Sequence, residues 1–397
     1  MPRPKKPPSH GRGTAAAQRE VMLLRIALRN LLYDRRRCAA SVTGVCFSVT
    51  LVIVQLGLFV GLAANSSQVI DRSPGDIWIT GRSTGNFQWG QPIPKRTLTV
   101  ARSTPGVAWA QELIVGWTQL RHPDGGSQQL EVVGFDLESR VGAPWHVVAG
   151  SLDTLSLPDR IVLDRSSMEK VGVFQLGDHR EALGHSVRIA AMTDGLTSFT
   201  TVPFVFASLP TARTLIGYIG PDETVYVVVG LEPGAAPAVT LSTLRQRLPH
   251  VDVFTRGAFS ARTRRYWMLE TGMGIGFLLT SALAIAVGAV IMSQAIYAAT
   301  SEYFPEYGTL TAMGMRRWSL AAVVIGQGVV AGLVGSFLGC MIGALAVTAI
   351  RQRGLEAVFT TELAVLTIAV ALITSALAAT TSVRRVWTLE PALVFRT

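Results

Sequence analysis

Four long stretches of this 397-residue sequence contain no Asp, Glu, Lys or Arg. A helix needs about 20 consecutive apolar residues to cross a hydrocarbon core of ~30 Å. Each of the four stretches meets that length, so the pattern predicts four transmembrane helices. We place them at residues 38–64, 271–300, 318–350 and 363–383.

The first apolar stretch needs separate treatment because it has features of a signal peptide. It follows Arg35, Arg36 and Arg37, and it ends in the small residues LAANS. The apolar region of a signal peptide is usually about 7–15 residues long, however, and this stretch is much longer. We therefore expect a retained membrane helix.

The segment 65–270 separates the first two spans and has a mixed pattern. Short runs rich in β-branched residues and bounded by Gly, Pro or Asp predict strands, and longer periodic segments predict helices. The fold class is therefore a membrane protein with four transmembrane α-helices and a large α+β extracytoplasmic domain between helices 1 and 2. We expect one lobe from 65–105 with 222–260, and a second from 106–221. The expected strands are 76–80, 114–120, 129–134, 160–163, 187–191 and 225–230, and the expected helices are 164–171 and 237–248.

The end of this domain, 258–270, has a helical pattern that runs directly into the second span. Tyr266 and Trp267 lie where the aromatic belt of a membrane interface is expected. Three arginines, Arg262, Arg264 and Arg265, precede them. The pattern predicts a stalk that joins the domain rigidly to the membrane.

The net charge of +10 is concentrated at the N-terminus. Residues 1–38 carry +8, residues 65–270 are neutral, and the remainder carries +2. We expect 1–20 to be a disordered basic tail and 21–37 to be an amphipathic cytoplasmic helix that leads into the first span; a plain helical extension of that span is the alternative. Basic residues beside a first span favour a cytoplasmic N-terminus. A neutral large domain gives little support to nucleic-acid binding.

This orientation assigns a side to every loop. Residues 65–270 lie outside the cytoplasm, 301–317 form a cytoplasmic loop, 351–362 form a short outer loop, and the tail 384–397 is cytoplasmic. We therefore expect a multi-pass protein of the inner membrane with both termini in the cytoplasm.

Small residues recur four apart within the spans. Such spacing lets helix backbones approach closely, so we interpret these glycines as helix-packing positions. Shorter examples are Gly57 with Gly61 and Gly272 with Gly276. The longest series is in the third span and comprises Gly328, Gly332, Gly335, Gly339 and Gly343.

Motifs for catalysis or cofactor binding are missing from the sequence. There is no phosphate-binding Gly-x-x-x-x-Gly-Lys-Ser/Thr, no His-x-x-x-His pair and no Cys-x-x-Cys. Ser167 and Lys170 match a Ser-x-x-Lys pattern without its usual partner motifs. No span contains a charged residue, which argues against an ion-coupled pump. We expect no enzyme activity, no metal and no cofactor in this chain.

The cytoplasmic loop 301–317 (SEYFPEYGTLTAMGMRR) is the most distinctive polar stretch. Glu302 and Glu306 share one face of a helix, where they could pair with basic residues of a partner. Leu310 and Met313 offer an apolar contact, and the glycines permit close approach. From the residues alone, a plain loop that contacts lipid headgroups fits equally well. As a docking surface the loop would use Glu302, Glu306, Gly308, Leu310, Met313 and Gly314.

The layout and this loop together resemble the MacB/FtsX-type permeases of ABC transporters. The stretch EYFPEYGTLTAMGM, 302–315, is similar to the cytoplasmic signature of that family. LRIALRNLLYDRRR, 24–37, and LEPALVFR, 389–396, resemble its terminal patterns, and GDIWIT, 75–80, leans toward the DevC-like branch, whose permeases lack a fused ATPase.

The resemblance implies a division of labour. A separate ABC ATPase subunit would bind Mg-ATP and dock on loop 301–317, and a second copy of the permease would complete the complex. Motion would pass through the stalk to the outer domain, for export of a lipid, peptide or other hydrophobic cargo. The DevC-like branch also implies a periplasmic adaptor (a membrane fusion protein) and an outer-membrane duct. The alternatives are an FtsX-like regulator that activates a periplasmic partner without transport, and a membrane sensor.

Overall fold

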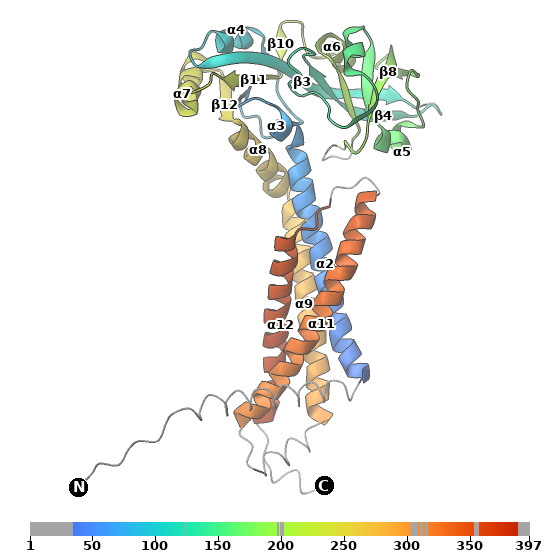
Figure 1. Cartoon of the computed structure of the whole chain (residues 1–397), viewed down its shortest axis with the longest axis vertical. Coiled ribbons are helices and arrows are strands. Elements are labelled where there is room, and N and C mark those ends of the chain that lie inside the picture. Colours follow the sequence, from blue (N-terminus) through green and yellow to red (C-terminus); the bar gives the residue numbers. More distant parts are fainter. Residues whose placement is uncertain are drawn as a thin grey trace, which may run out of the picture. The chain divides into compact units, whose positions relative to one another are not determined.

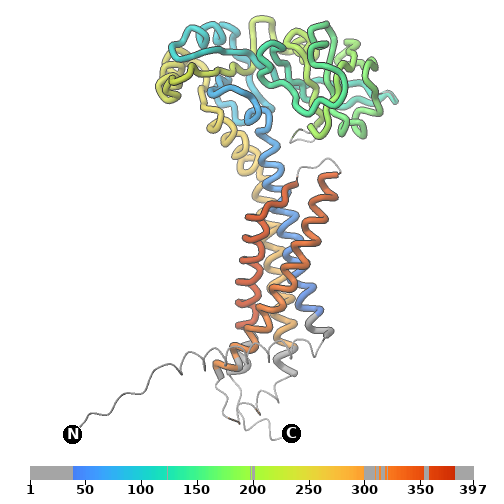
Figure 2. The backbone as a smooth tube through the Cα atoms, in the orientation of Figure 1, coloured from blue at the N-terminus to red at the C-terminus, as the bar shows by residue number. Residues whose placement is uncertain are grey.

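The computed structural model describes residues 35–122, 124–196, 198, 202–302, 309, 313, 317–352 and 357–387. The chain forms two compact units. The outer unit comprises Phe59–Ile275 and Ile350–Ala357, and the membrane unit comprises Met1–Leu58, Gly276–Ala349 and Val358–Thr397. Three of the long helices cross this division and supply residues to both units. Figures 1 and 2 show the course of the chain through both units.

Within the described part of the chain, four helices are long and apolar enough to cross a membrane, as the charge-free stretches predict. The expected spans begin and end within a few residues of the observed helices. The largest difference at a helix start is in α2, which begins three residues before the expected span. The helices are α2 (Arg35–Ser66), α9 (Met273–Glu302), α11 (Arg317–Gln352) and α12 (Thr361–Trp387).

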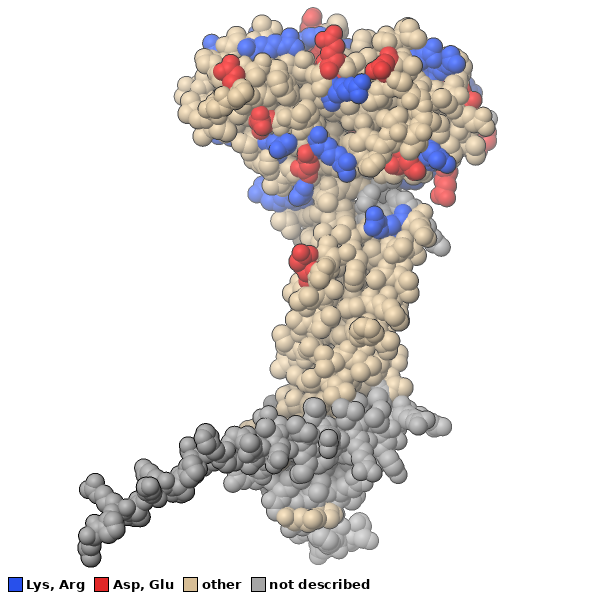
Figure 3. Space-filling model, viewed as in Figure 1, with Lys and Arg blue, Asp and Glu red and all other residues tan. Residues whose placement is uncertain are grey.

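The membrane unit exposes large apolar side chains. Leu279, Phe337 and Leu345 each keep more than three fifths of their surface exposed. In water such a surface would be unfavourable, but hydrocarbon chains of lipid would cover it at no such cost. Charged side chains gather instead over the outer unit (Figure 3). This division of surface chemistry agrees with four membrane-spanning helices.

The outer unit is built on one ten-stranded sheet, whose strands follow the order β12-β1-β11-β3-β4-β9-β6-β8-β5, with β7 paired to β3 and β8. Most neighbours are antiparallel; β4 with β9 and β6 with β8 are parallel. The strands are β1 (Ile77–Gly81), β3 (Val107–Arg121), β4 (Ser127–Phe135), β5 (Val147–Gly150), β6 (Arg160–Asp164), β7 (His179–Ala182), β8 (His185–Thr193), β9 (Phe204–Ser208), β11 (Tyr226–Leu231) and β12 (Val251–Thr255); β2 (Ile93–Pro94) and β10 (Glu223–Thr224) form a separate pair.

The expected division into two separate lobes is wrong at one strand. β3 is fifteen residues long; its first half pairs with β11 and its second half with β4. The sheet is therefore continuous across the expected boundary at residue 106. The short predicted strand 114–120 covers only the second half of β3, because the first half, VAWAQEL, has a weaker apolar pattern.

The sheet buries apolar side chains on both faces near β1, and alternation along the strand decides which side chain goes where. Ile77 and Ile79 point into a core with α4 (Arg96–Arg102) and α7 (Pro237–Arg247). Trp78 points the other way and joins a second core with Phe87 and Tyr226.

The remaining helices of the outer unit differ in places from expectation. The predicted helix 164–171 is split into a 3-10 turn, η2 (Arg165–Ser167), and a short α5 (Met168–Val171). The predicted helix 237–248 is α7. The others are α3 (Gln68–Arg72), η1 (Leu152–Ser156), α6 (Leu209–Ile216), α8 (Arg256–Arg265) and the π-helical turn η3 (Tyr266–Glu270).

Candidate functional site

We call two segments of the outer unit, residues 59–72 and 256–275, together the stalk. The first contains the end of α2, and the second contains the start of α9. They pack against each other through Trp267 and Met268, which are 5% exposed and contact Phe59, Leu62 and Ala63 of α2. Burying an indole and a thioether against one helix contributes a few kcal/mol. The two segments of the stalk are therefore a single packed body within the outer unit.

A polar clamp ties the stalk to the sheet domain. The indole N–H of Trp267 donates to Gln88 Oε1 at 3.0 Å, and Gln88 Nε2 donates to the carbonyl of Ser66 at 3.2 Å. Gln88 is buried and follows β1, so one amide side chain connects both segments of the stalk to the domain. Because the donors and acceptors are buried, breaking either bond would leave an unsatisfied polar group.

Charged contacts add to this clamp on the outside of the stalk. Arg264 of α8 forms an ion pair with Asp71 of α3, and its Nε donates to Ser67 Oγ at 2.7 Å. Arg262 Nε donates to the carbonyl of Thr84 at 2.8 Å. Arg265 forms an ion pair with Glu270 at 3.9 Å, so all three arginines that the sequence places before the second span bind the stalk or the domain.

The structure of the stalk differs from the sequence-based prediction in two respects. The helix does not run continuously into the second span: η3 is π-helical, and Gly272 has a φ of +76° before α9 begins. Only glycine adopts that backbone conformation without cost, so the break lies at a residue suited to it. Trp267 is buried in the clamp rather than exposed in an aromatic belt.

The glycine pair Gly272 and Gly276 was expected to pack between helices, and this is also wrong. A Cβ built on either glycine would meet no atom within 4 Å. Gly274 takes that position instead, since its Cβ would lie 2.9 Å from the ring of Phe59. A spacing of four residues does not reveal which glycines of a helix face a neighbour.

In α11 the structure places the glycine series against two different helices. Near the start of α11, Gly328 and Gly332 face α12, where a Cβ would lie within 3.0 Å of Ala379 and Ser375 respectively. Further along, Gly335, Gly339 and Gly343 face α2, with would-be contacts to Val45, Val49 and Ile53 under 3.0 Å.

At Gly335, Gly339 and Gly343 the neighbouring helix leaves no room for a side chain, since a Cβ would lie less than 3.0 Å from the nearest atom. At Gly335 and Gly339 the nearest atoms include the backbone carbonyl oxygens of Val42 and Cys46, which cannot move aside as a flexible side chain can. The absence of a side chain lets the backbones of α11 and α2 come together, which is the geometry expected of a helix-packing glycine.

The docking residues of loop 301–317 lie mostly outside the described residues. Glu302 is the last residue of α9, and nothing is described of its side chain. The side chain of Met313 is 79% exposed, and its N–H donates to the carbonyl of Thr309 at 3.0 Å. The other four, Glu306, Gly308, Leu310 and Gly314, lie outside the described residues, as do the predicted tail 1–20, most of the helix 21–37 and the C-terminal tail from 388.

Among the described residues, the outer unit buries three acids, Glu112, Glu131 and Asp164, and the sequence pattern does not predict the most deeply buried of them. Glu131 of β4 is fully buried, and Ser198 Oγ donates to its Oε2 at 2.6 Å. Burial raises the pKa of Glu131 to about 8, because the charged form loses its hydration. The sequence contains a sign of this burial: Glu131 is the single charged residue in the run LEVVGF, whose other residues are apolar or glycine.

The Ser-x-x-Lys pattern has a structural explanation. Ser167 is buried, and its hydroxyl donates to the carbonyl of Asp164 at 2.6 Å at the start of the helical turn. Partial burial lowers the pKa of Lys170. Among the residues that the structure describes, no group of three His, Cys, Asp or Glu side chains could hold a metal ion.

Comparisons with known proteins identify both parts of the chain. The family model of the MacB-like periplasmic core domain matches residues 39–247. The model of the FtsX-like permease C-terminal region matches residues 278–391. No curated protein matches this sequence closely enough to count as a relative.

Solved structures of low identity resemble the chain. The periplasmic region of MacB from Actinobacillus actinomycetemcomitans is 10% identical, and the match covers 49% of this chain and 96% of that one, with a TM-score of 0.36. The extracellular domain of the noncanonic ABC-type transporter YknZ from Gram-positive bacteria is 14% identical, with 45% and 98% covered and a TM-score of 0.34. A domain of a putative permease protein from Porphyromonas gingivalis is 17% identical, with 46% and 89% covered and a TM-score of 0.33.

Proposed function

This chain belongs to the MacB/FtsX-like permease family, and we propose that it is the permease subunit of an ATP-driven export complex. Permease domains of this kind are membrane components and not catalysts. A separate ABC ATPase would bind and hydrolyse Mg-ATP, and the permease would convert its closure into motion of the outer unit. The complex would contain two copies of the permease.

The stalk clamp is the observation that carries this proposal. A displacement of α2 or α9 at the stalk would be delivered to the sheet domain, because Gln88 and Trp267 bond both segments to it. Coupling of this kind requires a continuous packed body rather than a flexible linker. Residues 59–122 and 202–275, which contain both the clamp and much of the sheet, belong to one compact unit.

Loop 301–317 is the proposed docking element for the ATPase. In this arrangement Glu302 and Glu306 pair with basic residues of the ATPase, while the exposed Met313 fills an apolar notch. The DevC-like branch, a periplasmic adaptor and an outer-membrane duct belong to the same proposal. An adaptor in the purified complex supports export; a periplasmic hydrolase in its place would indicate an FtsX-like regulator.

Co-purification tests the docking step. Glu306→Lys, or Gly308→Trp, is expected to abolish co-purification of the ATPase while the chain still inserts into the membrane. Glu362→Lys is the matched control, because Glu362 lies in the first turn of α12 and outside the proposed docking loop. Undiminished co-purification of both loop variants would contradict the docking assignment.

Spin labels test the coupling step. With labels at the exposed Val173 in both copies, trapping the ATPase with ADP and vanadate is expected to shift the distance between them. Trp267→Ala is expected to abolish the shift while ATP hydrolysis continues. An unchanged distance in the unsubstituted complex would contradict mechanical coupling.

A further inference from the structure

A cavity of about 440 Å³ opens on the outer unit, and none of the residues that line it belongs to the stalk or to the proposed docking loop. Its walls come from the end of β1, from β2 with the start of α4, and from the turn that joins α7 to β12. Small-molecule sites usually have volumes of about 300–1,000 Å³, so this cavity is large enough for a ligand.

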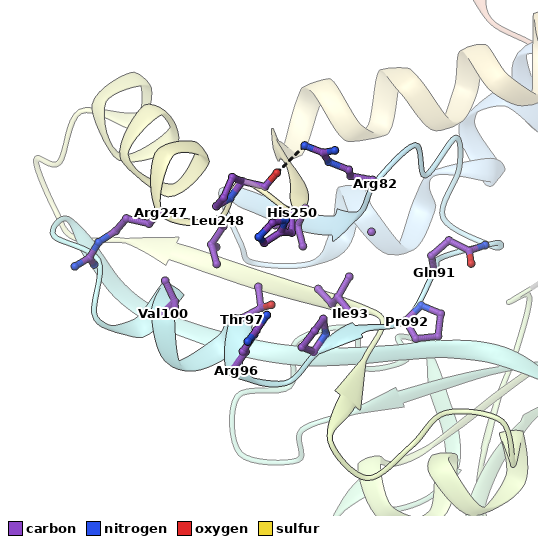
Figure 4. A pocket seen from close by; sticks show the side chains of 14 residues that line it. Arg82, Gln91, Pro92, Ile93, Arg96, Thr97, Val100, Arg247, Leu248 and His250 are labelled. Carbon is purple, nitrogen blue, oxygen red and sulfur yellow. Dashed lines mark hydrogen bonds between the residues drawn. The ribbon is translucent and has the colours of Figure 1, made fainter.

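The floor of the cavity is apolar. Ile93 and Leu248 line it, and both belong to the buried core beneath the sheet face. Val100 of α4 stands at one end, beside Arg247, and Pro92 at the other end, beside Gln91 (Figure 4). An apolar strip therefore runs between two polar ends.

The rim of the cavity is basic. Arg82, Arg96 and Arg247 line it together with His250, and none of its lining residues is an Asp or a Glu. The nearest carboxylate on the same strand is Asp252, which accepts the backbone N–H of Ser83 at 3.0 Å and does not line the cavity. The positive charge of the rim is therefore not balanced from within the site.

Two of these arginines are held in place by neutral acceptors. Arg82 donates to the carbonyl of Pro249 at 2.7 Å (Figure 4). Arg247 donates to the carbonyl of Ser103 at 2.8 Å. Each guanidinium carries five N–H donors, so both keep donors for a ligand. Arg96 forms no hydrogen bond or ion pair with any residue that the structure describes.

We propose that this cavity is a binding site for a small anionic amphiphile: a carboxylate or phosphate head held by Arg82 and Arg96, with a short unbranched apolar chain on Ile93 and Leu248. A guanidinium fork binds a carboxylate or a phosphate through paired hydrogen bonds. The enclosed apolar floor distinguishes such a ligand from a free anion, which would need only the rim. Binding at this site does not depend on whether the complex exports.

Photo-crosslinking to the full-length chain in nanodiscs locates the ligand. The probe is an octanoate analogue that carries a diazirine on its chain. A chain of that length stays dissolved as single molecules, so each labelled position reports the binding of one probe molecule. Mass spectrometry is expected to find the label in residues 91–100 and 247–251. Octanoate and octyl phosphate are expected to compete for it, whereas octanol, acetate and inorganic phosphate at the same concentration are not.

Charge reversal tests the rim. Arg96→Glu is expected to weaken competition by octanoate about tenfold or more, because it removes a charge-assisted contact. Arg165→Glu is the matched control: Arg165 is also exposed and without a described partner, but it lies in η2, outside the cavity. Unchanged near-ultraviolet circular dichroism of both variants shows that the outer unit remains folded.

Three results would overturn the proposal. The label could fall outside the cavity, Arg96→Glu could bind as tightly as Arg165→Glu, or octanol could compete as well as octanoate. Competition by inorganic phosphate alone would reduce the site to an anion site without a role for the apolar floor. Competition by an acidic peptide at lower concentrations than octanoate would assign the rim to a protein partner instead.

Discussion

The outer unit and the membrane unit differ in how their elements come into close contact. In the outer unit, polar groups are taken into the interior and bonded there, as with Asp164, Glu131 and the Gln88 clamp. In the membrane unit, α11 approaches its neighbours through residues that have no side chain at all, such as Gly335 and Gly339.

This difference follows from the two surroundings. In water, apolar burial drives the sheet domain to fold, and the polar groups carried inside must find partners. In lipid, helices gain nothing by hiding apolar side chains, so association depends on close packing. The outer unit should therefore be most sensitive to lost hydrogen bonds, and the membrane unit to added atoms.

The largest effect is expected at Asp164. Its buried carboxylate accepts hydrogen bonds from Thr193 and from the backbone N–H groups of Ser166, Gly195 and Leu196. Asp164→Ala would leave these donors without a partner, at a cost of about 3–5 kcal/mol in the free energy of unfolding. Hydrogen exchange of β6 and β8 amides in denaturant measures the loss.

The control for this prediction is Asp153→Ala. The side chain of Asp153 is 82% exposed and pairs with Arg140, so its removal should cost at most about 1 kcal/mol. Equal costs for the two substitutions would show that buried hydrogen bonding does not dominate the stability of the outer unit.

A second prediction concerns pH. The pKa of Glu131 is about 8 in the fold, against an ordinary value of 4.5, because of burial. Between these values the folded chain holds a proton that the unfolded chain releases. The contribution of Glu131 to the free energy of unfolding is therefore fully present below about pH 4.5. It is lost as the pH rises to about 8, by about 1.4 kcal/mol per pH unit.

Glu131→Gln separates this effect from the rest of the chain's titration. The amide cannot ionise. Between pH 5 and pH 8 the free energy of unfolding of the variant should therefore fall by about 3 kcal/mol less than that of the unsubstituted protein. The difference between two urea titrations of the outer unit, one at each pH, measures it. Parallel pH profiles for the two proteins would mean that Glu131 is already charged in the fold.

The sequence predicts the helices and the sheet domain much better than the contacts. Charge-free length fixes the four spans because the bilayer imposes one physical requirement on each of them. The Gln88–Trp267 bond joins residues far apart in the sequence, and no local pattern distinguishes this glutamine from an exposed one. The same reason explains Gly276: its spacing is that of a packing residue, but helix rotation, which depends on the neighbours, turns it away.

The third prediction tests the membrane unit by adding atoms. Gly335→Leu places a side chain where a Cβ alone would lie 2.7 Å from Val45, so α11 and α2 must separate, at a cost of about 1–3 kcal/mol. Gly276→Leu is the control because nothing lies within 4 Å of its Cβ. Thermal unfolding in nanodiscs should be lowered by the first substitution and not by the second; equal shifts would contradict close packing at Gly335.

The smallest effect is expected at the partly exposed ion pair between α3 and α8. Arg264 and Asp71 are 43% and 35% exposed, so solvent screens their attraction, and a double-mutant cycle with alanine should give a coupling of less than about 1 kcal/mol. A coupling above about 2 kcal/mol would place this pair among the buried contacts of the outer unit.

If the coupling is small, Arg264→Ala leaves the fold intact, and any loss of ATP-driven motion in that variant reflects the stalk's alignment rather than its stability. A weak contact between α3 and α8 is then the best place to separate folding from force transmission, since Trp267→Ala disturbs both.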